Sequence, residues 1–154
     1  MENIKYLIIL LGKRFTGKDY IGSVMAARLQ EKLHIKVNFV HATTEVKRDY
    51  ATYANLDLDK LCNDRNYKEA HREAMTLYSR GQMHLYGDLY YNKLFREKVL
   101  AMTLAPTIYI VDVRHKFEID YYLSFGIPIK TIKVNVDNNI KAKRGWIYNS
   151  YSTC

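Results

Sequence analysis

KYLIILLGKRFTGKD, residues 5–19, joins an apolar run to a basic loop bounded by glycines. The run Lys5 to Leu11 shows no polar alternation, which is typical of a strand buried on both faces of a parallel sheet. Gly12 to Asp19 then matches the first seven positions of the phosphate-loop pattern G-x-x-x-x-G-K-[ST]. In such a loop, backbone N–H groups and the N-terminus of the next helix face phosphate oxygens, and the lysine reaches the β- and γ-phosphates. The stretch therefore predicts that ATP binds here, with Lys18 at its phosphates.

The context and the eighth position of the motif leave alternatives open. An incidental Gly-Lys pair in a strand-to-helix turn is disfavoured, because the motif follows a predicted buried strand and opens a predicted amphipathic helix. Asp19 stands where Ser or Thr normally ligates Mg²⁺. A carboxylate can hold Mg²⁺ directly or through water, but an acid in the first turn is also favoured by the helix dipole alone.

The remaining chain alternates strand-like and helix-like segments. Further strands are predicted at residues 36–40, 107–113 and 129–136. Helices are predicted at 19–33, from a Thr44 cap to 54, from an Asp57 cap to 63, at 67–79 with a break near Gly81, and at 89–102, 117–124 and 138–144. This order builds a parallel sheet with right-handed crossovers. We therefore expect an α/β, three-layer P-loop fold with a mainly parallel central sheet, in a single domain covering residues 1–154.

Bulk composition limits the class of protein. The 154 residues are 48% hydrophobic, enough for a real core, and 24 Lys and Arg against 16 Asp and Glu give a net charge of +8, which predicts anionic partners. Two cysteines make no disulfide framework, so we expect reduced thiols and a cytosolic protein, with Cys62 in the core. The apolar run Tyr6 to Leu11 is too short to span a bilayer.

Several charged residues fall where a ligand is expected. Ligands gather at the carboxyl ends of parallel strands, where Asp112 and Arg114 should emerge, and Asp112 ends an apolar run as the Mg²⁺-positioning acid of P-loop enzymes does. Lys68 and Arg72 are four positions apart and are predicted to share one helix face. Taken singly, Lys47, Lys68 and Arg72 are better explained as solvated surface charges or as partners of Glu69. The histidines at positions 41, 71 and 84 show no metal-ligand spacing and are interpreted as ordinary polar or half-buried residues.

Five blocks of sequence together resemble one family. The loop GKRFTGKD, with Asp after the lysine, resembles the phosphate loop of the animal-type phosphomevalonate kinases. In order along the chain, Val46-Lys47 with Tyr50-Ala51, Tyr67-Lys68-Glu69 with Arg72 and Met75, Asp112-Val113-Arg114, and Arg144-Gly145-Trp146 resemble that family's LK..YA, YKE..R..M, D-x-R-R and RGW stretches. The resemblance covers nearly the whole chain, and only the loop is common in other kinases.

This resemblance implies an NMP-kinase-like fold and transfer of the γ-phosphoryl of Mg·ATP to 5-phosphomevalonate, giving 5-diphosphomevalonate and ADP in isoprenoid and sterol synthesis. By position, Lys18 and Arg114 would be catalytic, and Asp19 and Asp112 would hold the metal. Nucleotide-binding residues would be Gly12, Lys13, Arg14, Phe15, Thr16, Gly17, Lys18, Asp19 and the lid residues Lys141 and Arg144. Acceptor-binding residues would be Arg14, Lys47, Lys68, Arg72, Arg114 and His115. The cations would offset the repulsion between two polyanions brought together.

Two departures from the family pattern shape the expectations. The second arginine of D-x-R-R is His115 here, which is only partly charged near neutral pH. The family continues past RGW, whereas this sequence stops at Cys154, so we expect a shortened kinase domain. The alternatives are a nucleoside monophosphate kinase, a truncated non-catalytic nucleotide-binding protein and, least favoured, a nucleic-acid binder. We expect small-molecule partners, a monomer, no nucleic acid and no membrane insertion.

Overall fold

The computed structural model describes residues 2–13, 15–143 and 145, which form two compact units. An α/β unit contains the chain up to His41 and from Thr103 onward, and a helical unit contains residues 42–102. The two units are described separately. That the whole chain acts as one P-loop kinase domain stays a prediction.

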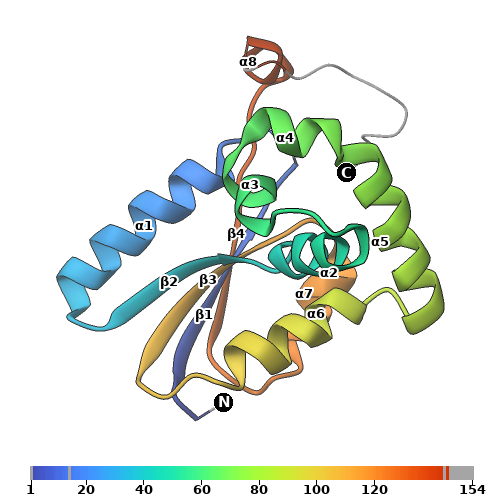
Figure 1. Cartoon of the computed structure of the whole chain (residues 1–154). Coiled ribbons are helices and arrows are strands. Elements are labelled where there is room, and N and C mark those ends of the chain that lie inside the picture. Colours follow the sequence, from blue (N-terminus) through green and yellow to red (C-terminus); the bar gives the residue numbers. More distant parts are fainter. Residues whose placement is uncertain (1, 14, 144, 146–154) are drawn as a thin grey trace. The chain divides into compact units, whose positions relative to one another are not determined.

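A four-stranded parallel sheet forms the centre of the α/β unit (Figure 1). Its strands are β1 (Ile4–Leu11), β2 (Lys36–His41), β3 (Thr107–Val113) and β4 (Ile129–Lys133), in the order β2-β3-β1-β4. All three pairings are parallel, so the predicted α/β class is confirmed. Every residue of β3 is buried, as expected for a continuous apolar strand in the middle of such a sheet.

The last strand is shorter than predicted. β4 ends at Lys133 rather than at residue 136, and among the described residues it pairs with β1 alone. Its ladder continues for one more hydrogen bond, from the Val134 N–H to the Leu11 carbonyl at 2.7 Å. Because β1 itself ends at Leu11, residues beyond Val134 have no ladder left to join.

Helices lie on both sides of this sheet (Figure 1). α1 (Lys18–Leu33) packs against one side and α7 (Lys116–Leu123) lies on the other, where its Tyr122 is fully buried. α1 approaches β2 closely, because a Cβ built on Gly22 would lie 2.6 Å from the Phe39 ring. An apolar groove of about 410 Å³ runs along α1 between Tyr20 and Lys32. The short helix α8 (Asn138–Lys143) follows β4.

The helical unit contains five α-helices and one π-helical turn among its described residues. They are α2 (Thr44–Ala54), α3 (Leu58–Asn63), α4 (Arg65–Ala70), α5 (Arg72–Tyr86), α6 (Tyr90–Phe95) and η1 (Arg96–Leu100). Asp57 caps α3 as predicted, accepting a hydrogen bond from the Lys60 N–H at 3.1 Å. The cap of α2 is Thr43 instead of Thr44, and its side chain makes no capping hydrogen bond.

The predicted helix over residues 67–79 is wrong in both its continuity and its end. His71 has φ −99° and ψ 0°, which lies outside the helical region and separates α4 from α5. α5 then continues through Gly81 to Tyr86. A glycine in an exposed helix costs only about 1 kcal/mol relative to alanine, which is too little to end a helix that is anchored by packing. Lys68 and Arg72 therefore lie on different helices and do not share one helix face.

The helical unit has its own core of Tyr50, Ala51, Leu61 and Met75. Cys62, predicted to be a core residue, is only half-buried. Among the described residues, no helix combines the length and the apolar character needed to cross a membrane.

Candidate active site

The loop between β1 and α1 has the backbone shape that its glycines predict. Gly17 caps α1 with φ 89°, a left-handed conformation that glycine adopts without steric cost. Gly12 is needed for a different reason: a Cβ there would lie 2.6 Å from the Val134 carbonyl oxygen. The buried Thr16 closes the loop through a hydrogen bond from its hydroxyl to the Lys13 carbonyl at 2.8 Å. Phe15, with φ 61°, is a non-glycine residue in the left-handed region.

Lys18, the first residue of α1, places its ammonium group inside this loop. Its side chain is buried, and Nζ donates hydrogen bonds to the carbonyl oxygens of Gly12 and Lys13. Burial lowers the pKa of Lys18, an effect that Asp112 and Asp19 oppose and Arg114 reinforces. The ammonium thus lies inside the loop on two neutral carbonyl acceptors, and a phosphate that replaced them would add an opposite charge to the contact.

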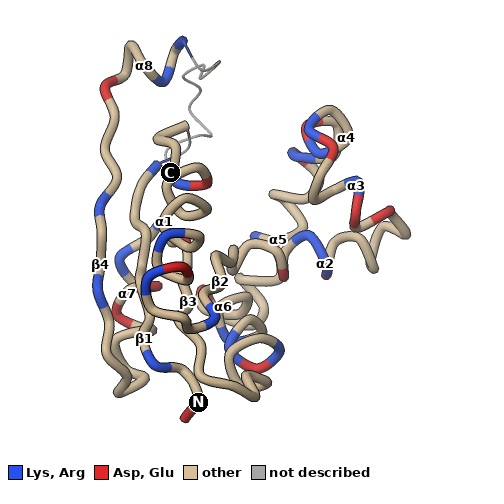
Figure 2. Tube along the Cα trace, turned by 90° about the vertical axis from the view of Figure 1, so that its left-hand side faces the viewer, with Lys and Arg blue, Asp and Glu red and all other residues tan. Residues whose placement is uncertain are grey.

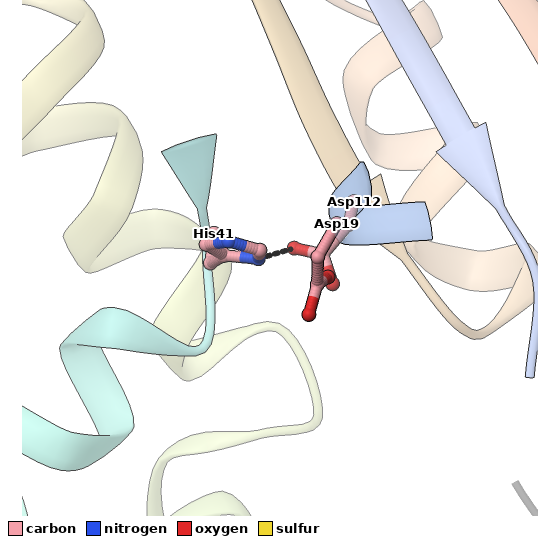
Figure 3. Close-up of side chains that lie close together, drawn as sticks. All are labelled: Asp19, His41 and Asp112. Atoms are coloured by element: carbon pink, nitrogen blue, oxygen red, sulfur yellow. Dashed lines mark hydrogen bonds and ion pairs between the residues drawn. The ribbon is translucent and has the colours of Figure 1, made fainter. Parts of the chain in front are cut away.

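Two carboxylates and one imidazole meet at the carboxyl ends of β2 and β3 (Figure 3). Asp112 is the penultimate residue of β3, and His41 is the last residue of β2. His41 Nδ1 lies 2.9 Å from Asp112 Oδ1. Asp19, exposed in the first turn of α1, completes a cluster whose potential ligand atoms all lie within 4.8 Å of one another.

The ionised form of Asp112 is favoured in this setting. Burial by itself raises the pKa of the carboxyl group, but the hydrogen bond and charge of His41, followed by the charges of Arg114 and Lys18, outweigh it and hold the pKa below its usual value. The carboxylate oxygens of Asp112, at the end of a strand, and of Asp19, at the start of a helix, are ligands of the kind that Mg²⁺ prefers.

Arg114 and His115 connect β3 to α7. Both side chains are exposed, and both backbone N–H groups donate to Glu118 Oε2 at 2.8 Å. His115 is the N-cap of α7 and stacks on Phe117, with ring centroids 5.2 Å apart. Glu118 therefore already accepts hydrogen bonds from the two backbone N–H groups of this turn, so an anion here would be bound by the side chains of Arg114 and His115.

The predicted acceptor residues are divided between the two units. Lys47 lies half-buried on α2, Lys68 half-buried on α4, and Arg72 begins α5. Arg72 pairs with Glu69, as the surface-charge interpretation predicts. Their role at an acceptor site stays a prediction.

Two further residues, Lys141 and Arg144, were predicted to form a lid, and this role stays a prediction. Figure 2 shows α8 beyond the end of β4. Lys141 lies on this helix, and its Nζ donates a hydrogen bond to Asn138 Oδ1 at 3.0 Å. Arg144, and Arg14 of the phosphate loop, lie outside the described residues.

His41 is the member of the cluster that sequence reasoning missed. It was interpreted as an ordinary polar residue because its sequence has no metal-ligand spacing. A signal was nevertheless present, since His41 follows directly on the second predicted strand, and polar residues at the ends of parallel strands gather at one edge of the sheet.

Comparisons with known proteins identify the family of the chain. The sequence model of the phosphomevalonate kinase family matches residues 10–126, which include the loop, the His41–Asp112 pair and Arg114. A phosphomevalonate kinase of Drosophila melanogaster is 30% identical over 144 residues, covering 92% of this chain and 74% of the relative. The resemblance drawn from the sequence blocks is confirmed, and the chain belongs to the phosphomevalonate kinase family.

Proposed function

We propose that this chain transfers the γ-phosphoryl group of ATP to the phosphate of 5-phosphomevalonate, giving 5-diphosphomevalonate and ADP, a step of the mevalonate pathway to isoprenoids and sterols. The observation that carries the proposal is the buried ammonium of Lys18 inside the glycine-bounded loop, next to the buried carboxylate of Asp112. Family membership supplies the acceptor.

On the nucleotide side, the loop from Gly12 to Asp19 would hold the phosphates. Lys18 would exchange its two carbonyl partners for β- and γ-phosphate oxygens and stabilise charge on the phosphoryl group during transfer. Asp19 and Asp112 would hold Mg²⁺, whose oxygen-ligand preference their carboxylates meet. When bound, this ion neutralises charge on the β- and γ-phosphates. Lys13 and Arg14 are assigned to the same phosphates.

On the acceptor side, cations are needed because two polyanions must come within bonding distance. Arg114 is the best supported, because its charge already acts on both Lys18 and Asp112. Its guanidinium can bind a phosphate through two parallel hydrogen bonds. The other assigned acceptor residues are Arg14, Lys47, Lys68, Arg72 and His115, and Lys141 and Arg144 are assigned to a lid over ATP. We further propose that the protein acts as a monomer in the cytosol.

A coupled assay of ADP release tests the proposal. The purified chain is supplied with Mg·ATP and 5-phosphomevalonate or, in parallel, with a panel of nucleoside monophosphates. Turnover with 5-phosphomevalonate alone supports the proposal. Turnover only with a nucleoside monophosphate would assign a different acceptor, and ATP binding without any turnover would indicate a non-catalytic nucleotide-binding protein.

A further inference from the structure

We propose that His41 is a positioning residue for the Asp112 carboxylate: by holding one carboxylate oxygen, its imidazole leaves the other available to the divalent cation that Asp112 and Asp19 would hold. The inference rests on the proposed function, because it concerns the metal of the same site. His41 itself is not assigned to bind the metal, ATP or the acceptor.

Strand pairing fixes the distance between the two residues. His41 and Asp112 are direct partners in the parallel pairing of β2 with β3, so their backbones are held side by side by the sheet. The side chains meet at 2.9 Å between Nδ1 and Oδ1 (Figure 3). The contact between His41 and Asp112 is therefore held by the backbone pairing of β2 with β3 and does not depend on the conformation of a loop.

The imidazole is itself restrained. Phe39 lies two residues earlier on the same strand and therefore on the same face of the sheet. Its ring meets the His41 ring edge-on, with centroids 4.6 Å apart. His41 also remains partly open to solvent, with a third of its side chain exposed, whereas only 5% of the Asp112 side chain is. The hydrogen bond therefore joins a partly exposed imidazole to a buried carboxylate.

Without the imidazole, Asp112 would have other partners to choose from. The charges of Arg114 and Lys18 both act on this carboxylate. A carboxylate freed from His41 would rotate toward these cations and away from the orientation that it shares with Asp19. Groups that hold metal ligands in place in this way typically change metal affinity by about 10- to 100-fold when they are removed.

The test measures metal binding separately from catalysis. Mn²⁺ replaces Mg²⁺, and its free concentration is followed by electron paramagnetic resonance in the presence of a non-hydrolysable ATP analogue. Three variants are compared with the wild type. His41→Leu removes the donor, His41→Asn keeps an amide donor at a similar reach, and His84→Leu is the control, because His84 is exposed on α5 of the helical unit.

We expect His41→Leu to weaken Mn²⁺ binding by about 10- to 100-fold. His41→Asn should restore most of the loss, and His84→Leu should match the wild type. Affinity for the ATP analogue measured without metal should stay unchanged in all of them. Wild-type Mn²⁺ affinity in His41→Leu would overturn the inference. So would a loss of Mn²⁺ binding as large in His41→Asn as in His41→Leu, because that pattern makes the imidazole a direct ligand.

The two proposals fail in different ways. A wild-type protein that binds Mn²⁺ with the analogue but transfers nothing to 5-phosphomevalonate would refute the proposed function and leave the role of His41 intact. If His41→Leu does not fold, as judged by circular dichroism, the comparison of His41→Asn with Asp112→Asn decides: near wild-type Mn²⁺ binding in the first and a strong loss in the second support the inference, and equal losses overturn it.

Discussion

Replacing Lys18 by methionine separates the catalytic role of this residue from its structural one. Methionine has a similar length and no charge, so the change removes the ammonium while filling most of the same space. In the transfer step, the buried ammonium is expected to stabilise charge on the phosphoryl group. Loss of such a group typically costs about 10²- to 10³-fold in rate, which corresponds to about 3–4 kcal/mol.

The effect on stability should be small, and its sign follows from the pKa. The lowered pKa of Lys18 means that folding disfavours the charged amine relative to the neutral one. Replacing Lys18 by methionine removes the free-energy cost of burying this charge. Against this stand the hydrogen bonds to the Gly12 and Lys13 carbonyls, which for a charged donor contribute about 1.5–3 kcal/mol each. Because these effects oppose each other, we expect the free energy of unfolding to change by less than about 2 kcal/mol.

The assay combines urea unfolding with the ADP-release assay on the same preparations. Lys32→Met is the matched control, because Lys32 lies exposed in the last turn of the same helix, α1. The control should keep the wild-type rate and stability. A folded Lys18→Met protein that retains more than about a tenth of the wild-type rate would refute the argument that this ammonium stabilises the transferred phosphoryl group.

Three further changes test other parts of the account. Arg114→Ala should raise the KM for 5-phosphomevalonate at least about tenfold and change the KM for ATP little, because loss of one charge-assisted phosphate contact costs about 1.5–3 kcal/mol. Steady-state kinetics with each substrate varied in turn measures the two KM values, and an equal rise in both would contradict the assignment of Arg114 to the acceptor. Gly12→Ala should lower the free energy of unfolding by about 1–3 kcal/mol, because the Cβ of the alanine would lie 2.6 Å from the Val134 carbonyl oxygen. Thermal unfolding measures the change, and an unchanged melting temperature would show that the loop moves freely. Tyr91→Phe should reduce the loss of stability at alkaline pH. Burial, together with the charge of Asp49 and a 3.1 Å hydrogen bond to its carboxylate, raises the pKa of Tyr91. The folded protein therefore keeps a proton that the unfolded chain releases, and the free energy of unfolding of the wild type falls as the pH rises above 10.0. Parallel alkaline unfolding curves for the two proteins would count against that reasoning.

Much of the α/β unit was predictable because its signals are local. β1 and β3 are mostly apolar runs without polar alternation, and the glycine-bounded loop between β1 and α1 matches a known phosphate-binding pattern. The helical unit was harder, because its breaks do not follow the residues that usually mark them. α5 passes through Gly81, and the chain turns instead at His71, an ordinary residue in sequence.

The candidate site divides in the same way. Lys18, Asp19 and Asp112 were predicted because each lies within a motif or at a strand end. His41 was missed because its partner is 71 residues away and only the register of β2 with β3 brings the two together. The register of two strands is set when the sheet assembles, and the residues flanking His41 do not indicate which residue of β3 it will pair with.

The most direct measurement is ³¹P nuclear magnetic resonance of the products formed from Mg·ATP and 5-phosphomevalonate by the purified chain. The account predicts that the monophosphate signal of the acceptor is replaced by two coupled signals of a new diphosphate, at the same rate as ADP appears. An acceptor signal that stays unchanged while ATP is consumed, or while a nucleoside monophosphate is phosphorylated instead, would contradict it.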